Sequence, residues 1–475
     1  MNALQLSASD FRTLAAQVTG LAADYLATLG DRPTFPEVSG QSSVNAFREA
    51  LPEKGLGSTA FDALTAVLDF SRPPSPRFFG YVLGSGEPVA ALADLLASVL
   101  NQNVTAWRSA PAAVTLERHV VEALAAALNC RGYGGSFCGG GSMANLMALA
   151  MAREARLPAN AAGARPGVVY ASSEVHMSIP KAMALLGLGR ENLRLIPADE
   201  RFRMSLASLR EAITADRAAG RVPLAVVASS GTVNTGSIDP LPEIAALCRE
   251  HELWMHVDGA YGALAALAVP ERFAGLNAAD SLSLDPHKWL YQPLDCGVLL
   301  FKDAKAARVA FSHTGDYARS LTEDPLEGFA FFDESLELSR RFRALKVWLS
   351  LRYHGLDAFR RAIRADLRHA QLLAQQVAAS GRLELAAPVV LSAVCFRYLS
   401  ESQPADSDRL NAAILRRVIE RGRVYLSNAT LGGGFALRAC FVNHRTTEAD
   451  VAQIVPEVLA AAEEVLDARL QRLPR

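Results

Sequence analysis

The stretch Asp280-Ser-Leu-Ser-Leu-Asp-Pro-His-Lys-Trp-Leu290 carries the strongest chemical signal in this chain. Residues 281–284 predict a short buried strand, and Lys288 follows soon after its end. An amine forms a Schiff base with an aldehyde only when it is neutral, and burial beside a positively charged group favours the neutral amine. Lys288 is therefore a candidate for holding an aldehyde cofactor. The alternative, one of many surface lysines, stays open on this stretch alone.

A second apolar run, residues 253–257, ends in Asp258 and continues with small residues. A carboxylate at a strand end can pair with a protonated pyridine nitrogen, as in sites for the aldehyde cofactor pyridoxal phosphate. Asp258 is the candidate partner of that nitrogen, and the small side chain of Ala260 leaves room for a flat ring. Taken alone, an acid at this place is more often a helix cap or a turn residue.

Glycines at 139–141 lead into an apolar-periodic helix, with Ser142 near its start. Free backbone N–H groups, the helix dipole and a serine hydroxyl together form a site where a phosphate can bind. Gly141 and Ser142 are the expected phosphate contacts. A dinucleotide site is the alternative, and the downstream lysine argues against it.

His176 and Thr232 each follow a predicted strand and complete the set of polar candidates. An imidazole at 176 could stack on the cofactor ring, and the hydroxyl of Thr232 would lie at a strand exit. A capping or surface histidine and a simple turn residue are the alternatives.

Short apolar strands alternate with helical stretches between about residue 76 and residue 355, which is typical of an α/β fold. Strand ends in such a sheet line a ligand crevice. The strands are expected at 168–172, 194–197, 224–228, 254–258, 281–284 and 298–301, with two more at 389–396 and 435–441. We expect three parts: a helical arm at 1–75, a large cofactor-binding domain at 76–355 and a small domain at 356–475.

In their order along the chain, these motifs resemble the group II pyridoxal-phosphate decarboxylases, the family of the aromatic-L-amino-acid, histidine and glutamate decarboxylases. The resemblance covers nearly the whole chain. It rests on Phe78-Phe-Gly-Tyr81, Asn101-Gln-Asn103, the glycine run, His176, His256-Val-Asp-Gly-Ala-Tyr261, Asp285-Pro-His-Lys-Trp-Leu290, Asp295-Cys-Gly297, Arg340-Arg-Phe-Arg343 and Leu437-Arg-Ala-Cys440.

The resemblance implies a role for each residue around the cofactor ring. Lys288 forms the Schiff base, and Asp258 pairs with the pyridine nitrogen. His176 stacks on one face of the ring and Ala260 packs on the other, with Thr232 near the ring substituents.

The phosphate of the cofactor is expected to contact Gly141, Ser142 and His287. Some animal relatives have asparagine where this chain has Asp285, so the resemblance does not carry a phosphate contact over to that acid. It also implies a fold-type-I, aspartate-aminotransferase-like large domain, a small α+β C-terminal domain and a homodimer. The apolar stripe of Phe11, Leu14, Val18 and Leu21 on the arm would then lie across the partner subunit.

Composition agrees with a globular enzyme, because 475 residues with 50% hydrophobic content are ample for a large core. A net charge of -1 gives no global field to attract nucleic acid or an anionic membrane. The six cysteines show no metal-ligand spacing, so we expect reduced thiols and no metal site. We expect neither a secretion signal nor a membrane span, and hence a cytoplasmic location.

The expected reaction is decarboxylation of an L-amino acid to the amine, with the substrate carboxylate leaving from an apolar pocket. Oxygen-dependent decarboxylation to an aldehyde is the main alternative. Two alternatives are less favoured: an aminotransferase with the same fold, and a ligand-binding protein without catalytic activity.

The resemblance implies a substrate pocket with Phe79, Tyr81, Asn103 and Thr105, because these residues match pocket-forming stretches of aromatic decarboxylases. It favours an aromatic substrate without ranking phenylalanine, tyrosine and tryptophan. Family members use a loop tyrosine as proton donor, and an ungapped count places Phe331 at that position. Tyr317 is the alternative if the loop contains an insertion.

Overall fold

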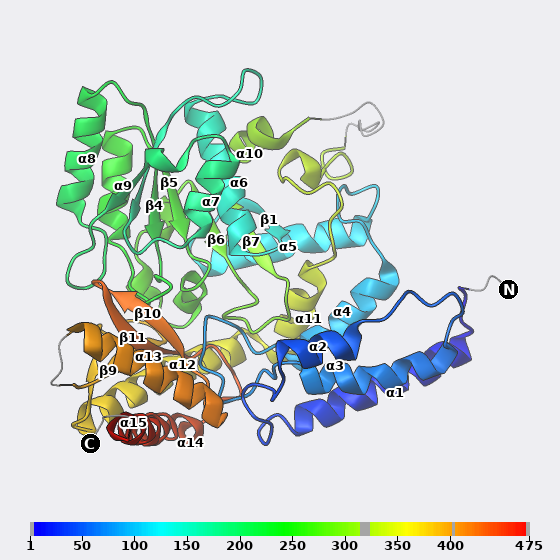
Figure 1. The fold of residues 1–475 in the computed structure, drawn as a ribbon. Helices are drawn as coiled ribbons and strands as arrows, with labels where there is room; N and C mark the ends of the chain where they lie inside the picture. The colour runs from blue at the N-terminus through cyan, green and yellow to red at the C-terminus, as the bar shows by residue number, and fades with distance from the viewer. Residues whose placement is uncertain (1–3, 314–323, 401–403, 472–475) are drawn as a thin grey trace.

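The amino-terminal arm is helical and extends away from the rest of the chain (Figure 1). The computed structural model describes residues 4–313, 324–400 and 404–471. Helix α1 (Ala8–Ala27) begins at Ser7, whose side chain accepts a hydrogen bond from the backbone N–H of Asp10. The arm continues through α2 (Gly40–Phe47) and α3 (Leu64–Phe70). No residue of α1 is fully buried, and Phe11 and Val18 are exposed within the protomer.

A seven-stranded sheet forms the centre of the large domain, in the order β1-β7-β6-β5-β4-β2-β3. Strands β2 to β6 are parallel, and β7 runs antiparallel to both of its neighbours. The strands are β1 (Gly134–Cys138), β2 (Val168–Ser172), β3 (Leu193–Ile196), β4 (Pro223–Ser229), β5 (Trp254–Asp258), β6 (Ser281–Leu284) and β7 (Gly297–Phe301). The six strands expected from the sequence in this domain are confirmed within one or two residues, whereas β1 was not expected.

Helices cover both faces of this sheet, which explains why its strands are apolar almost throughout. One face packs against α6 (Gly141–Arg156), α7 (Ser178–Leu185) and α10 (Ala304–Phe311). The other face packs against α5 (Pro111–Ala127), α8 (Leu206–Ala218) and α9 (Leu241–Glu250). Figure 1 shows the two layers on either side of the strands.

The C-terminal part is a second α+β unit with its own core. Its antiparallel sheet has the order β10-β11-β9-β8. The elements are α12 (Leu356–Ala379), β8 (Leu383–Leu385), β9 (Ala393–Tyr398), α13 (Pro404–Arg421), β10 (Ser427–Leu431), β11 (Gly434–Cys440), α14 (Glu448–Val451) and α15 (Ile454–Leu470).

Two helices join the large domain to its surroundings. Helix α4 (Pro88–Leu100) packs on α11 (Ala344–His354), and Gly355 separates α11 from α12. The first half of α12 contributes Phe359 and Ile363 to the core of the large domain, so the two domains share this helix. The expected boundary at residue 355 therefore stays a prediction.

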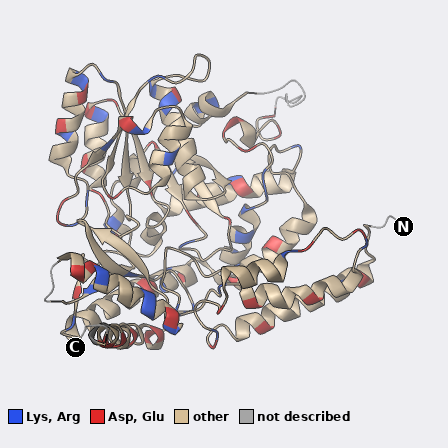
Figure 2. Ribbon diagram, viewed as in Figure 1, with Lys and Arg blue, Asp and Glu red and all other residues tan. Residues whose placement is uncertain are grey.

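Acidic and basic residues are interspersed along the ribbon, as Figure 2 shows. Within the three described ranges, none of the helices combines the length and the apolar composition needed to cross a membrane.

Candidate active site

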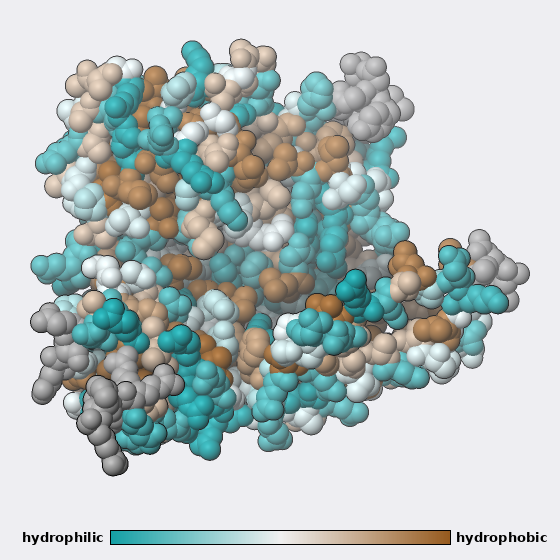
Figure 3. Space-filling view, viewed as in Figure 1, coloured by the Kyte–Doolittle hydropathy of each residue, from teal (hydrophilic) through white to brown (hydrophobic). Residues whose placement is uncertain are grey.

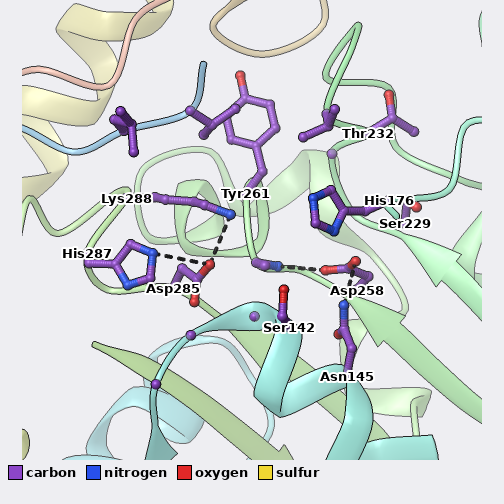
Figure 4. A pocket seen from close by; sticks show the side chains of 18 of the residues that line it. Ser142, Asn145, His176, Ser229, Thr232, Asp258, Tyr261, Asp285, His287 and Lys288 are labelled. Carbon is purple, nitrogen blue, oxygen red and sulfur yellow. Dashed lines mark hydrogen bonds and ion pairs between the residues drawn. The ribbon is translucent and has the colours of Figure 1, made fainter. Parts of the chain in front are cut away.

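A cavity of about 280 Å³ lies where the C-terminal ends of the parallel strands meet the start of α6. The ends of β4 and β5, the turn after β6 and the loop after β1 all contribute to its wall. This is the edge at which α/β sheets bind ligands. Figure 4 shows polar side chains from these separate elements pointing into the same space.

Lys288 lies in the turn after β6, where its backbone N–H donates to the carbonyl of Asp285. Its Nζ lies 2.9 Å from Asp285 Oδ2, so the ammonium has a carboxylate partner inside the cavity. Asp285 is buried, and its Oδ1 has no hydrogen-bond partner in the described part of the chain. The pair therefore contains a free acceptor as well as an amine that can react (Figure 4).

His287 lies on the other side of the same carboxylate, with Nε2 at 3.5 Å from Asp285 Oδ2. Its Nδ1 accepts a hydrogen bond from the backbone N–H of Cys296, which places the ring proton on Nε2. Burial lowers the pKa of His287, since desolvation outweighs the nearby Asp285 carboxylate. His287 can therefore offer a neutral N–H donor to an anion.

Asp258 is the last residue of β5, and three neutral donors hold its carboxylate. Oδ2 accepts from Asn145 Nδ2 at 2.9 Å. Oδ1 accepts from Ser283 Oγ at 3.1 Å and from the backbone N–H of Ala260 at 3.2 Å. The carboxylate is thus fixed in one orientation, as required of a group that pairs with a ring nitrogen.

Asn145 connects Asp258 to a buried histidine. Its Oδ1 lies 2.9 Å from His256 Nε2, and its Nδ2 also donates to Ser178 Oγ at 2.9 Å. Burial lowers the pKa of His256 to about 4, so this ring is neutral near pH 7. Because the Asp258 carboxylate can only accept, Asn145 turns Nδ2 towards it and Oδ1 towards His256, which then donates from Nε2.

The start of α6 forms a cradle without side chains. Gly140 has φ +129, and no side chain caps the helix. A Cβ on Gly141 would lie 2.6 Å from Ala260 Cβ and 3.1 Å from Asp285 Oδ2. A side chain there would fill the space that a ligand needs, and the uncapped first N–H groups favour an anion.

His176 and Thr232 complete the wall (Figure 4). Ser178 donates its backbone N–H to His176 Nδ1, and burial lowers the pKa of this imidazole. Thr232 is buried, with its Oγ1 at 2.9 Å from Thr235 Oγ1. Every residue that the sequence suggested for the cofactor lines this one cavity: Gly141, Ser142, His176, Thr232, Asp258, Ala260, His287 and Lys288.

The expected aromatic wall of the substrate pocket is placed differently. Phe79 is 1% exposed and packs on Phe441 in the core of the C-terminal domain. Tyr81 is 54% exposed and does not line the cavity. The chain turns at Tyr81, where φ is +58, and presents Val82 and Leu83 to this cavity. The part of Phe79 and Tyr81 in a substrate pocket therefore stays a prediction.

Asn103, Thr105 and Phe331 lie together, but none of them lines the cavity. Phe331 donates its backbone N–H to the carbonyl of Thr105, and Asn103 Oδ1 accepts from the backbone of Arg340. The Phe331 ring is fully buried, with the Arg340 guanidinium carbon 4.2 Å from its centre. The prediction that these side chains form the substrate pocket is not supported by this cavity and stays a prediction. Tyr317 lies outside the described residues.

Two partners of Asp258 could not be found from the sequence. Asn145, which lines the cavity, and Ser283, which does not, lie inside a helix and a strand, where only the folded structure brings them to Asp258. Gly139 and Gly140 of the glycine run also line the cavity, and the other wall residues outside the expected set are Val82, Leu83, Glu174, Ser229, Gly231, Val233, Tyr261, Asp285 and Leu294.

This set of groups fits pyridoxal phosphate on the chemistry of its donors. The amine of Lys288 matches an aldehyde, the carboxylate of Asp258 matches a ring nitrogen, and the uncapped glycine-led helix matches a phosphate. The unpartnered Asp285 Oδ1 is a further sign of a polar ligand at this place.

Comparison with known proteins agrees with this fit. Residues 62–399 match the pyridoxal-dependent decarboxylase conserved domain. The aromatic-L-amino-acid decarboxylase of Bacillus atrophaeus is 36% identical, with 97% of each chain covered. The 4-hydroxyphenylacetaldehyde synthase of Rhodiola rosea is 31% identical, with 93% of this chain and 92% of that protein covered. The crystal structure of Oryza sativa TDC with PLP and tryptamine has a TM-score of 0.91 at 28% identity, covering 97% of this chain and 99% of that one.

Proposed function

The chain belongs to the pyridoxal-dependent decarboxylase family, and we propose that its substrate is an aromatic L-amino acid, which it converts to the amine and carbon dioxide. It is an amino-acid decarboxylase with the fold-type-I architecture, and its cofactor is pyridoxal 5'-phosphate. The observation that carries the proposal is the convergence of Lys288, Asp258 and the uncapped start of α6 in one cavity. Each of these groups matches one part of the same cofactor.

When bound, pyridoxal phosphate supplies the electron sink that stabilises the α-carbon after carbon dioxide leaves. The residues of the chain hold and tune this group. Lys288 attaches it, and Asp258 keeps the ring nitrogen protonated. The N–H groups of Gly141 and Ser142 and the Nε2–H of His287 would bind the phosphate, while His176 and Ala260 would pack against the ring.

Apolar side chains on the cavity wall support loss of the carboxylate. Val82 and Leu83 offer no hydrogen bond to a substrate carboxylate, and a carboxylate held against them would be poorly solvated. No arginine lines the cavity in the described part of the chain. This favours an aromatic side chain over one with a second carboxylate, and decarboxylation over transamination of dicarboxylic substrates.

The α-carbon must then receive a proton. His176 is one candidate donor on the cavity wall, because Ser178 donates to Nδ1 and leaves the ring proton on Nε2. Burial lowers the pKa of His176, and a neutral imidazole is a weak acid, so it is a poor general acid for this step. Slow protonation leaves time for oxygen to react, which is the second candidate function, and a relative named as an aldehyde synthase shares 31% identity.

Aromatic L-amino acids should give the highest rates of amine release in a screen across the standard L-amino acids. We expect kcat/KM for tryptophan, tyrosine or phenylalanine to exceed that for glutamate or histidine by at least about tenfold. The amine should be the main product, with a smaller amount of aldehyde and peroxide that depends on oxygen. Amine, aldehyde and peroxide are measured together, with and without oxygen. Aldehyde as the dominant product would replace decarboxylation by the oxidative alternative.

The variant Phe331→Tyr serves as control in the same assay. Because the Phe331 ring is buried away from the cavity, a hydroxyl there has no route to the substrate in this arrangement. We expect an unchanged ratio of amine to aldehyde and a loss of about 1–3 kcal/mol in unfolding free energy from the buried hydroxyl. A clear shift of the ratio towards amine would return Phe331 to the site of proton transfer.

We also propose a homodimer, supported by the apolar outer face of α4. Leu92, Leu95, Leu96, Val99 and Leu100 are between 45% and 58% exposed and follow helical spacing. On the arm, Phe11 and Val18 are also exposed, and Figure 3 shows apolar side chains gathered there. Patches of this kind are typical of an interface with another copy of the chain.

The double variant Leu92→Asp/Leu96→Asp should therefore shift the protein from dimer to monomer. Light scattering after size exclusion should give twice the chain mass of 50.8 kDa for the wild type and one chain mass for the variant. The control is Leu185→Asp/Leu195→Asp, which changes two leucines that are also exposed, on α7 and β3. An active monomeric wild type would contradict the proposal.

A further inference from the structure

The turn that carries Lys288 continues into buried side chains that meet a single carboxylate. Trp289 donates from Nε1 to Asp366 Oδ2 at 3.1 Å, and Tyr291 donates its hydroxyl to the same oxygen at 2.8 Å. Asp366 lies on α12 and is 1% exposed. The backbone N–H of Asn443 donates to the same carboxylate. One acid thus joins the lysine turn to α12 and to the segment after β11.

Burial of the Asp366 side chain costs free energy. No cation lies within ion-pair distance of Asp366 in the described part of the chain, and burial raises its pKa to about 7, against the effect of its three donors. An apolar residue of similar size would remove the desolvation penalty of the acid. It would also leave the donors of Trp289 and Tyr291 buried without an acceptor, so the exchange is favourable only if these donors are removed too. The carboxylate is therefore matched to these two side chains.

Trp289 and Tyr291 both help to determine where Lys288 lies. Tyr291 donates its backbone N–H to the carbonyl of Lys288 and has φ +54, a strained value for a non-glycine residue. The Trp289 ring packs on Tyr261 with 5.3 Å between ring centres, and Tyr261 lines the cavity. Asp366 therefore fixes the chain immediately after Lys288 and supports one wall of the cavity from behind.

We propose that Asp366 is a positioning residue, which holds Trp289 and Tyr291 and thereby sets where the amine of Lys288 stands in the cavity. The inference rests on the proposed role of Lys288 as the residue that attaches the cofactor. It assigns to α12 a part in the site, although α12 contributes no residue to the cavity wall in the described part of the chain.

The test measures how fast cofactor-free protein attaches pyridoxal phosphate, followed by absorbance and trapped with borohydride. Asp366→Leu removes the acceptor, and Asp366→Asn keeps an oxygen for both donors. We expect attachment about tenfold slower or more in Asp366→Leu, and within about threefold of the wild type in Asp366→Asn. The absorbance band of the attached cofactor should shift in the leucine variant and be restored in the asparagine variant.

Thermal unfolding separates this role from simple stabilisation. If Asp366→Leu melts at a lower temperature but attaches the cofactor at the wild-type rate, with the wild-type band, the positioning role is overturned. If Asp366→Leu does not fold, Tyr291→Phe decides, because it removes one of the two side-chain donors and keeps the acid. We expect Tyr291→Phe to slow attachment of pyridoxal phosphate and to shift the absorbance band. A wild-type rate and band in Tyr291→Phe would overturn the proposal.

The wild-type protein distinguishes failure of the proposed function from failure of the positioning role alone. A wild-type protein that attaches no pyridoxal phosphate would overturn the proposed function and this inference with it. Normal attachment in the wild type, together with an unchanged rate in Asp366→Leu, would overturn the positioning role alone.

Discussion

Lys288→Ala should leave no borohydride-fixed cofactor on the chain and should lower kcat by on the order of 10³-fold or more. The amine of Lys288 is the group in the cavity able to bond to an aldehyde, and Asp285 holds it at the cavity wall. After reduction and digestion, mass spectrometry of the wild type should find the cofactor on the peptide that contains Lys288. Lys305→Ala on α10, which changes an exposed lysine, should retain both cofactor and activity.

A second variant, Lys288→Arg, tests whether Lys288→Ala is inactive only because it is less stable. Removing Lys288 leaves the buried carboxylate of Asp285 without its cation, which can destabilise a protein by about 3–5 kcal/mol. Lys288→Arg keeps a positive charge beside Asp285 but cannot make the same bond to the cofactor. We expect this variant to fold more stably than Lys288→Ala and to be equally inactive. Reducible attachment of pyridoxal phosphate in Lys288→Ala would show that another residue holds it.

Asp258→Ala should raise the barrier of the reaction by several kcal/mol, on the order of 10²–10⁴ in kcat. Without the carboxylate the ring nitrogen loses its anionic partner, and the bound cofactor accepts electrons less well. We expect kcat to fall much more than KM rises, because the acid acts on the ring and not on the substrate. Steady-state kinetics on protein saturated with pyridoxal phosphate measures both.

Asp239→Ala is a matched control for this variant. Asp239 is also buried, and it accepts from the backbone N–H groups of Met204 and Ser229, while burial raises its pKa to about 6. Its loss should lower the melting temperature with less than about a tenfold effect on kcat. Near-normal turnover of Asp258→Ala, or an equal loss in both variants, would contradict the assigned role of Asp258.

The cofactor site could be predicted from the sequence because its residues stand at strand ends and at a helix start. Parallel strands bring their C-terminal ends to one edge of the sheet, so that Asp258, Thr232 and Lys288 meet without any knowledge of long-range pairing. The glycines before Ser142 predicted the proposed phosphate end of the site in the same local way, from a helix start.

What could not be predicted depends on tertiary packing. Strand β1 contains two glycines and no β-branched residue, yet a Cβ on Gly134 would lie 2.8 Å from the Phe301 ring, and one on Gly135 would lie 2.4 Å from the carbonyl oxygen of Leu299. The residues packed around β1 therefore require glycine at these positions, although glycine has a low strand propensity. The place of Phe79 likewise follows from pairing with Tyr425 in the C-terminal domain, which the local sequence does not encode.

The position of β1 at one edge of the large sheet also sets the order in which the protein can mature on the ribosome. Residues 134–138 leave the exit tunnel early, but their only partner strand in the sheet is β7, at residues 297–301. The start of α6, which follows β1, cannot pack beside Asp285 until about two thirds of the chain has been synthesised. Pairing over such a sequence distance is slow, and the unpaired edge is prone to misassociation meanwhile. Production of active enzyme should therefore respond to translation speed and chaperone supply across this interval, independently of how much cofactor the cell provides.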